Sequence, residues 1–336
     1  MFHLFDDTDM NAGRLRVNID RWNPDPRIIA RAARVLRGGG LAAFPTETVY
    51  GLGANGLSPD AVNKIFRAKG RPTDNPLILH LAAPEQAELL AGVDGRAADT
   101  MKAFWPGPLT LVLPARAHVP KEVTAGLSTV ALRMPDHPVA LALIEAARCP
   151  IAAPSANRSG RPSPTDAEAV EADLGDRIDI LLDAGSVDVG LESTVIDLTG
   201  RKILLLRPGG TPAERLEEFF GEPLETPGDD AKRRSPGTRY RHYAPALPVY
   251  VWTPGEGEKM PRSIDPSTSG FMGMTPPSEN FARTILFDSE KSYARGMFAG
   301  FRHFEAEGLL HIVVEWPRSQ GIGLALQDRI RRASAC

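Results

Sequence analysis

Cysteine is scarce in this chain of 336 residues, and the two that occur, Cys149 and Cys336, lie far apart. Their spacing forms neither a metal-binding motif nor a redox pair, and so few thiols are typical of the reducing cytosol. The first residues, with Asp6, Asp7 and Asp9, contain no apolar core of a signal peptide, and no run of 18 apolar residues could span a membrane. We therefore expect a cytoplasmic protein with no membrane partner.

The chain also lacks a strong charge of either sign and a Walker A phosphate loop. Its net charge of -3 excludes a globally basic nucleic-acid binder, although local basic patches remain open. A G-x-G-x-x-G pattern does occur at Gly51, Gly53 and Gly56. A dinucleotide fingerprint needs its first glycine directly after a strand and an acidic residue at the end of the next strand, and neither condition is met. The pattern therefore does not predict a nicotinamide enzyme.

The length and hydrophobic content of the chain suit two α/β domains. With 42% hydrophobic residues it can bury a large core, and its length exceeds that of one typical domain. Predicted strands alternate with helices, while a hairpin around Thr199 and Gly200 indicates that the first sheet is mixed. The predicted divisions are an N-terminal extension over 1–24, a catalytic domain over 25–220, a Pro/Gly-rich basic linker over 221–248, and a small α/β domain over 249–336.

The first site candidate is the stretch FPTETVYGLG, from Phe44 to Gly53. The residues over 40–44 are continuously apolar and bounded by glycine and Pro45, which predicts a short buried strand. Polar side chains follow directly, and open α/β sheets bind their ligands at this end of a strand. We expect the loop to line a binding site.

Four cations occur at positions that suit an anion. Lys69 and Arg71 flank the glycine that ends a predicted helix, where solvated charges would also be expected. Arg133 and Arg207 end apolar strands, where a guanidinium requires a carboxylate, phosphate or other hydrogen-bonding partner. Hydroxyl and amide side chains at other strand ends, each of which could equally serve a turn, are Ser155, Asn157, Ser163, Ser193 and Thr194. Together they predict a polar cleft that binds anions.

Several longer motifs resemble the YrdC-like family, in its long two-domain form. Between Gly38 and Gly210 the order and spacing of the motifs are similar throughout. Beyond them, SPGTRYRHYAP (235–245) resembles the family's linker and GIGLALQDRIRRA (321–333) its C-terminal end. The motifs of the first domain are FPTETVYGLG, FRAKGRPTDNPLILH, WPGPLTLVL, STVALRMPDHP, APSANRSGRPSPT, ESTVID and LLRPGG.

The resemblance implies an open, mixed, twisted sheet with helices, followed by a smaller Rossmann-like α/β domain. It implies an L-threonylcarbamoyladenylate synthase that joins L-threonine, bicarbonate and ATP, with Mg2+ carried by ATP and no dedicated metal site. The product would pass to threonylcarbamoyl-transferase machinery that modifies the adenosine beside the anticodon of ANN-reading tRNAs. The threonine pocket would comprise Thr48, His80, Arg133, Ala153 and Ser193. The ATP contacts would be Arg71, Asn75, Thr129, Ser155, Ser163, Arg207 and Tyr243, with Lys69 and Arg71 as catalytic cations.

The residues themselves are also compatible with two other functions. One is weak RNA binding by a basic and aromatic stretch, whose alternative interpretation is a solvated linker; the stretch contains Lys232, Arg233, Arg234, Arg239, Tyr240, Arg241 and Tyr243. The other is a related carbamoyl transfer that uses carbamoyl phosphate. We further expect residues 235–245 to close over bound nucleotide as a lid, the alternative being a passive tether.

Overall fold

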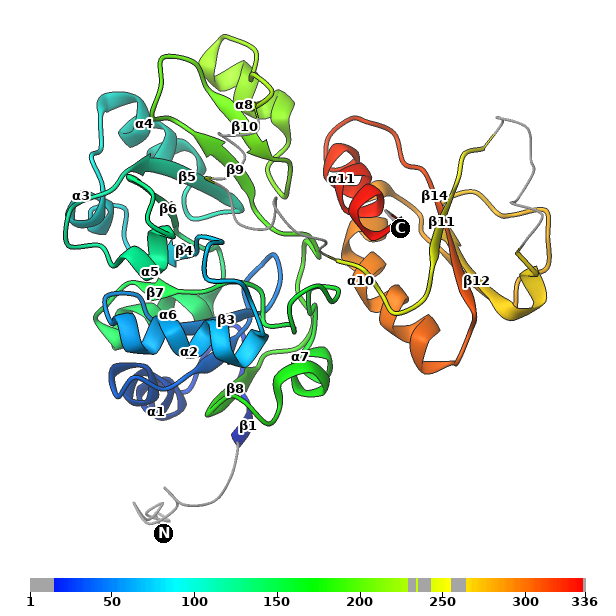
Figure 1. Ribbon diagram of the computed structural model, residues 1–336, viewed down its shortest axis with the longest axis horizontal. Coiled ribbons are helices and arrows are strands. Elements are labelled where there is room, and N and C mark those ends of the chain that lie inside the picture. Colours follow the sequence, from blue (N-terminus) through cyan, green and yellow to red (C-terminus); the bar gives the residue numbers. More distant parts are fainter. Residues whose placement is uncertain (1–14, 229–233, 235–242, 255–263, 335–336) are drawn as a thin grey trace.

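Two β-sheets, each with its own core, organise residues 15–228, 234, 243–254 and 264–334, which the computed structural model describes (Figure 1). The first sheet is mixed, in the order β1-β8-β2-β3-β7-β4-β6-β5-β9-β10. Strands β9 and β10 form the antiparallel pair predicted around Thr199 and Gly200, which confirms that hairpin. The strands are β1 (Leu15–Asn18), β2 (Ala42–Phe44), β3 (Gly51–Asn55), β4 (Ile78–His80), β5 (Leu109–Pro114), β6 (Thr129–Arg133), β7 (Ile151–Ala152), β8 (Ile180–Asp183), β9 (Thr194–Asp197) and β10 (Leu204–Arg207).

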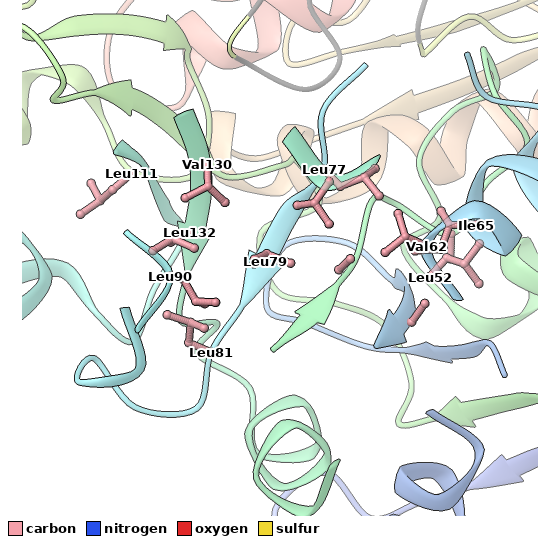
Figure 2. Close-up of a cluster of buried hydrophobic side chains, with 14 of the residues drawn as sticks. Leu52, Val62, Ile65, Leu77, Leu79, Leu81, Leu90, Leu111, Val130 and Leu132 are labelled. Atoms are coloured by element: carbon pink, nitrogen blue, oxygen red, sulfur yellow. The ribbon is translucent and has the colours of Figure 1, made fainter. Parts of the chain in front are cut away.

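Helices cover both faces of this sheet because neighbouring strand residues point to opposite sides. Ile151 belongs to the core under α1 and α6, whereas Ala152 belongs to the core that contains the apolar side of α2. Figure 2 shows the second of these cores, where Val62 and Ile65 lie near Leu52 and Leu77. The helices are α1 (Pro26–Arg37), α2 (Pro59–Lys69), α3 (Gln86–Leu90), α4 (Gly95–Phe104), α5 (Lys121–Thr124), α6 (Pro138–Ala147), α7 (Ala167–Leu174) and α8 (Ala213–Phe220).

Two segments of this domain differ from the predicted division. Strand β1 lies within the stretch predicted to be an N-terminal extension, yet it pairs in parallel with β8 and belongs to the sheet. The glycines predicted to edge a loop form β3, antiparallel to β2. A Cβ atom at Gly53 would lie 2.7 Å from the Phe44 ring and 2.8 Å from Cγ2 of Ile151. Glycine is therefore required here for close packing across the sheet.

The second sheet is parallel throughout, in the order β11-β14-β12-β13, which agrees with the expected Rossmann-like domain. The sequence did not predict β12, whose two glycines disfavour a strand. At Gly270 the Phe304 ring takes the space of a side chain, with ring atoms 2.7 to 2.8 Å from where a Cβ would be. The elements are β11 (Val249–Trp252), the 3-10 turn η2 (Pro266–Thr268), β12 (Ser269–Gly273), β13 (Arg283–Leu286), α10 (Glu290–Ala306), β14 (His311–Glu315) and α11 (Gly323–Ser334).

Helices α10 and α11 face the first domain (Figure 1). Leu191 of the first domain packs in the same core as Tyr293 and Met297 of α10. A Cβ atom at Gly190 would lie 2.4 Å from Cα of Arg295, so the loop before β9 touches the backbone of α10. This close approach brings the second domain against the loop that carries Glu192 and Ser193.

Candidate functional site

A polar pocket lies where the ends of several strands of the first sheet meet. Strands β2, β4, β6, β7 and β10 deliver residues to it, either at their ends or in the loops that follow them. Its lining consists of Thr46, Thr48, Val49, Gly51, Arg71, Leu77, Ile78, His80, Arg133, Ala153, Pro154, Ser155, Asn157, Glu192, Ser193, Arg207 and Tyr243. The pocket therefore lies at the strand-end position predicted from the loop after Phe44.

Most of the predicted site residues are brought together here. The predicted residues in the lining are Thr48, Arg71, His80, Arg133, Ala153, Ser155, Asn157, Ser193, Arg207 and Tyr243. Those that are buried nearby without lining it are Lys69, Asn75, Thr129 and Ser163. The role of each residue stays a prediction. Glu192 was not among the predicted site residues, although a carboxylate shortly before an apolar strand is a recognisable signal.

Arg133 and His80 form one side of the pocket because β4 and β6 are parallel and place the two residues in register. Nε of Arg133 donates to the carbonyl of Gly107 at 3.3 Å. One terminal nitrogen of Arg133 lies 2.6 Å from a carboxylate oxygen of Glu47, without the alignment of a hydrogen bond. Both oxygens of Glu47 lack hydrogen bonds to the described residues. Arg133 and Glu47 therefore form a buried ion pair, and this nitrogen of Arg133 still lacks a hydrogen bond to the described residues.

His80 is a neutral imidazole in this environment. Burial, and then the charge of Arg133, lowers the pKa of His80 to about 3. Its Nδ1 atom has no hydrogen-bond partner among the described residues. A neutral ring can hydrogen-bond a polar ligand beside Arg133 without adding charge.

The loop between β2 and β3 is held by its own threonines. The Thr46 hydroxyl donates to the carbonyl of Val49 at 2.7 Å and lies 2.8 Å from the hydroxyl of Thr48. Side-chain bonds of this kind stabilise a tight turn. They account for both threonines being fully buried and keep Thr48 at the pocket wall.

Arg71 and Arg207 supply the other cations of the lining. Gly70 ends α2 in the left-handed conformation, with φ of 62°, and this turn directs Arg71 inward. A terminal nitrogen of Arg71 donates to the carbonyl of Pro76 at 3.0 Å. Arg207 donates from Nε and Nη2 to the carbonyl of Ser193, at 3.1 and 2.9 Å. Backbone carbonyls therefore help to hold both guanidinium groups at the pocket wall.

Lys69 lies behind the pocket wall. Its Nζ atom donates to the carbonyls of Ser155 and Asn157, at 2.6 and 2.5 Å, and approaches Oδ1 of Asn157 at 3.4 Å. Burial and the charge of Arg71 lower the pKa of Lys69 well below its ordinary value, whereas three oxygen acceptors favour the ammonium form. In this arrangement Lys69 fixes the loop that carries Ser155, and a direct phosphate contact stays a prediction.

Glu192 connects the pocket with the second domain. It accepts hydrogen bonds from the Ser163 hydroxyl and, at 2.7 Å, from Nε of Arg329 on α11. The Tyr243 ring stacks on Phe298 of α10 with centroids 5.6 Å apart, and Arg329 lies 5.0 Å from the Tyr243 centroid. Residues 235–242 of the predicted lid lie outside the described residues.

Within the described ranges, no cluster of three or more His, Cys, Asp or Glu side chains could hold a metal ion. No helix in the same ranges is both long and apolar enough to cross a bilayer. The pocket instead combines three arginines, a neutral histidine and several hydroxyls. Such a lining can bind two anionic groups and orient them by hydrogen bonds.

Comparison with known proteins covers both domains. The Sua5/YciO/YrdC family, described as telomere recombination, matches residues 34–209. A second family, described as the C-terminal domain of threonylcarbamoyl-AMP synthase, matches residues 211–335. Together they account for both units of the fold.

Individual relatives match over nearly the whole chain. The threonylcarbamoyl-AMP synthase of Pyrococcus abyssi is 45% identical over 333 residues, which is 95% of this chain and 96% of the relative. That of Bacillus subtilis is 44% identical over 326 residues, or 92% and 93% of the two chains. The crystal structure of P. abyssi Sua5 complexed with L-threonine superposes with a TM-score of 0.87 at 44% identity, covering 95% of this chain and 97% of that one.

Proposed function

The chain belongs to the threonylcarbamoyl-AMP synthase family, and on that basis we propose that it joins L-threonine, bicarbonate and ATP into threonylcarbamoyl-AMP and pyrophosphate. The observation that carries the proposal is that one pocket unites Arg133 and His80 with Arg71 and Arg207. The reaction must hold two anions together, an amino-acid carboxylate and a triphosphate. A pocket with cations from β6, β10 and the end of α2 meets that requirement.

We assign the amino acid to the side formed by Arg133 and His80. A guanidinium fork matches a carboxylate through two parallel hydrogen bonds, and Arg133 has donor capacity there. The hydroxyls of Thr48 and Ser193 would pair with the polar groups of threonine. Ala153 would face its methyl group, because an alanine leaves room and offers no competing polar atom.

We assign the triphosphate to the side of Arg71 and Arg207. Their guanidinium groups would contact phosphate oxygens, while Ser155, Ser163, Asn75 and Thr129 would position the nucleotide and Tyr243 would approach from the linker. Lys69 would act through the loop that carries Ser155, unless binding of ATP redirects its ammonium group.

The chemistry requires no nucleophile from the protein. The amine of threonine takes up bicarbonate as a carbamate, with loss of water, and a carbamate oxygen then attacks the α-phosphorus. The bond from that phosphorus to the bridging oxygen breaks, and pyrophosphate leaves. Positioning of the two substrates and stabilisation of developing phosphate charge by Arg71 and Arg207 are therefore the expected sources of rate.

Mg2+ would enter with ATP and offset part of the triphosphate charge. Among the described lining residues the carboxylate is that of Glu192, and both of its oxygens already accept hydrogen bonds, from Ser163 and Arg329. The donor set therefore suits an ion held by the phosphates and not by a cage of carboxylates.

We further propose that the product serves a threonylcarbamoyl transferase that modifies tRNA, and that the reaction takes place in the cytoplasm. Weak RNA binding by the linker and closure of a lid over 235–245 stay predictions, since most of those residues lie outside the described ranges. Arg234, which is described, pairs with Asp197 at 2.7 Å. One of the cations predicted to bind RNA is therefore paired with a carboxylate of the protein.

The test is the release of pyrophosphate by the purified chain, with mass spectrometry of the product. Release should require ATP, L-threonine and bicarbonate together. Release supported by carbamoyl phosphate in place of threonine and bicarbonate would indicate the related carbamoyl transfer. Salt-sensitive tRNA binding with no turnover of ATP would instead favour an RNA-binding module.

A further inference from the structure

Arg329 is a fully buried cation on α11 whose main contacts lie in the other domain. Its exposed fraction is 0%, and it donates from Nε to Glu192 at 2.7 Å and from Nη2 to the carbonyl of Pro208 at 3.1 Å. Within its own helix it pairs with Asp328. A buried guanidinium needs partners for its charge and its donors, and two of the three come from segments flanking β9 and β10.

The partner Glu192 lines the pocket and is itself almost fully buried. Burial raises the pKa of its carboxyl, but the charges of Arg329 and Arg207 and hydrogen bonds from Ser163 and Arg329 outweigh burial, so that the pKa lies below its ordinary value. The pocket therefore contains a carboxylate anion. An uncompensated anion at this position would repel a triphosphate bound at Arg207.

Arg207 is a second cation that acts on Glu192, and the buried ammonium group of Lys69 is a third. At present Arg207 donates to the carbonyl and hydroxyl of Ser193. Without Arg329, Glu192 would lose its hydrogen-bonded cation, and its attraction for Arg207 would draw the two side chains together. The charge that the pocket offers to phosphate would then be reduced.

We infer that Arg329 is a positioning residue for the nucleotide half of the pocket: it neutralises Glu192, holds it as the acceptor of Ser163 and leaves Arg207 directed at phosphate. The inference rests on the proposed function in one respect, namely that this half of the pocket binds ATP. It assigns to the second domain an indirect part in nucleotide binding, through Glu192.

Arg302 provides a matched control on α10. It joins the same two domains, through Asp173 at 2.7 Å and the carbonyl of Pro162 at 2.6 Å, and it is mostly buried. Pro162 precedes Ser163, so loss of Arg302 disturbs the same interface and the same loop. It does not remove the charge that faces Glu192.

The experiment measures binding of α,β-methylene-ATP to the full chain by calorimetry, since this analogue cannot release pyrophosphate. R329M should raise the Kd about tenfold or more, the loss of about one charge-assisted hydrogen bond. R302M should change the Kd less than about threefold. In the double variant E192Q/R329M, which removes both charges but keeps an acceptor for Ser163, the Kd should return to within about threefold of the original.

R329K keeps a cation beside Glu192 and should bind the analogue better than R329M. If R329M does not fold, R329K and the double variant carry the test. Neither leaves a charge at position 192 without a partner, and Asp328, which loses Arg329 in the double variant, keeps its ion pair with Arg332. Equal Kd values for R329M, R302M and the unmodified chain would overturn the inference. A double variant that binds the analogue no better than R329M would also overturn it. If R329M does not fold, a double variant that binds about tenfold or more weakly than the unmodified chain would do so.

The outcome is separable from that of the proposed function. Absence of pyrophosphate release from the unmodified chain would refute the synthase reaction, yet the binding series would still measure the coupling between Glu192 and Arg329. Conversely, normal release with unchanged Kd values in every variant would refute only the positioning role.

Discussion

Replacement of Arg133 by lysine should weaken threonine binding selectively. Lysine keeps the charge but is a single ammonium group, so it cannot present two parallel donors to a carboxylate. It also loses the contact from Nε to the carbonyl of Gly107 that orients the guanidinium. Glu47, whose oxygens lack hydrogen bonds to the described residues, would attract the freed ammonium away from the pocket.

The expected loss is about 1.5 to 3 kcal/mol, the value of one hydrogen bond to a charged group, or roughly 10- to 150-fold in the Kd of threonine. Binding of ATP should change little, because Arg71 and Arg207 are unaltered. Calorimetry with each ligand measures both quantities. A matched control is Arg34→Lys on the exposed side of α1, which should alter neither. An equal loss of ATP affinity, or unchanged threonine affinity, would refute the assignment of Arg133.

Four further changes test other parts of the site and fold. Arg71→Ala should lower kcat/KM for ATP by roughly 30- to 150-fold with little change in the melting temperature, and unaltered ATP kinetics would contradict its role. His80 has a pKa of about 3 in the folded state against 6.5 when unfolded, so the unfolded state binds more protons between these values. The free energy of unfolding should therefore fall on acidification, by about 1.4 kcal/mol per pH unit below pH 6. In His80→Gln, urea unfolding between pH 4 and 6 should show a weaker dependence of that free energy on pH. Gly53→Ala should destabilise the fold by about 1 to 3 kcal/mol because its Cβ meets the Phe44 ring, and an unchanged urea midpoint would disprove that contact. Tyr243→Ala should lower product yield if the linker closes over the nucleotide, whereas full yield together with ligand-independent tryptic cleavage of residues 235–245 would favour a passive tether.

The sequence predicted those parts of the fold and site whose signals are local. Apolar periodicity and caps identify α1 and α2, and the turn at Thr199 and Gly200 identifies a hairpin. Arg133 was predicted at a strand end and His80 was placed with it by the family resemblance, and the parallel pairing of β4 and β6 brings the two into register. The resemblance of the motifs to the YrdC-like family added the prediction of which residues bind threonine and which bind ATP.

Other features depend on contacts that local patterns do not encode. Strand β3 contains glycines that disfavour a strand, and only the approach of Phe44 and Ile151 explains them. Lys69 has the charge expected of a phosphate ligand, but the position of a neighbouring loop determines where its ammonium group points. Arg329 looks like any charged residue of an amphipathic helix until the other domain is placed against it.

The pairing of Glu192 with Arg329 also has a consequence for the order of synthesis. The two residues are 137 positions apart in the chain. The ribosome therefore completes the whole first domain, with its arginines and hydroxyls, long before the partner of Glu192 exists. During that interval the carboxyl group of Glu192 must stay exposed to water, keep its proton or pair with Arg207. The part of the pocket around Glu192 acquires its final charge only when α11 has been made and has docked.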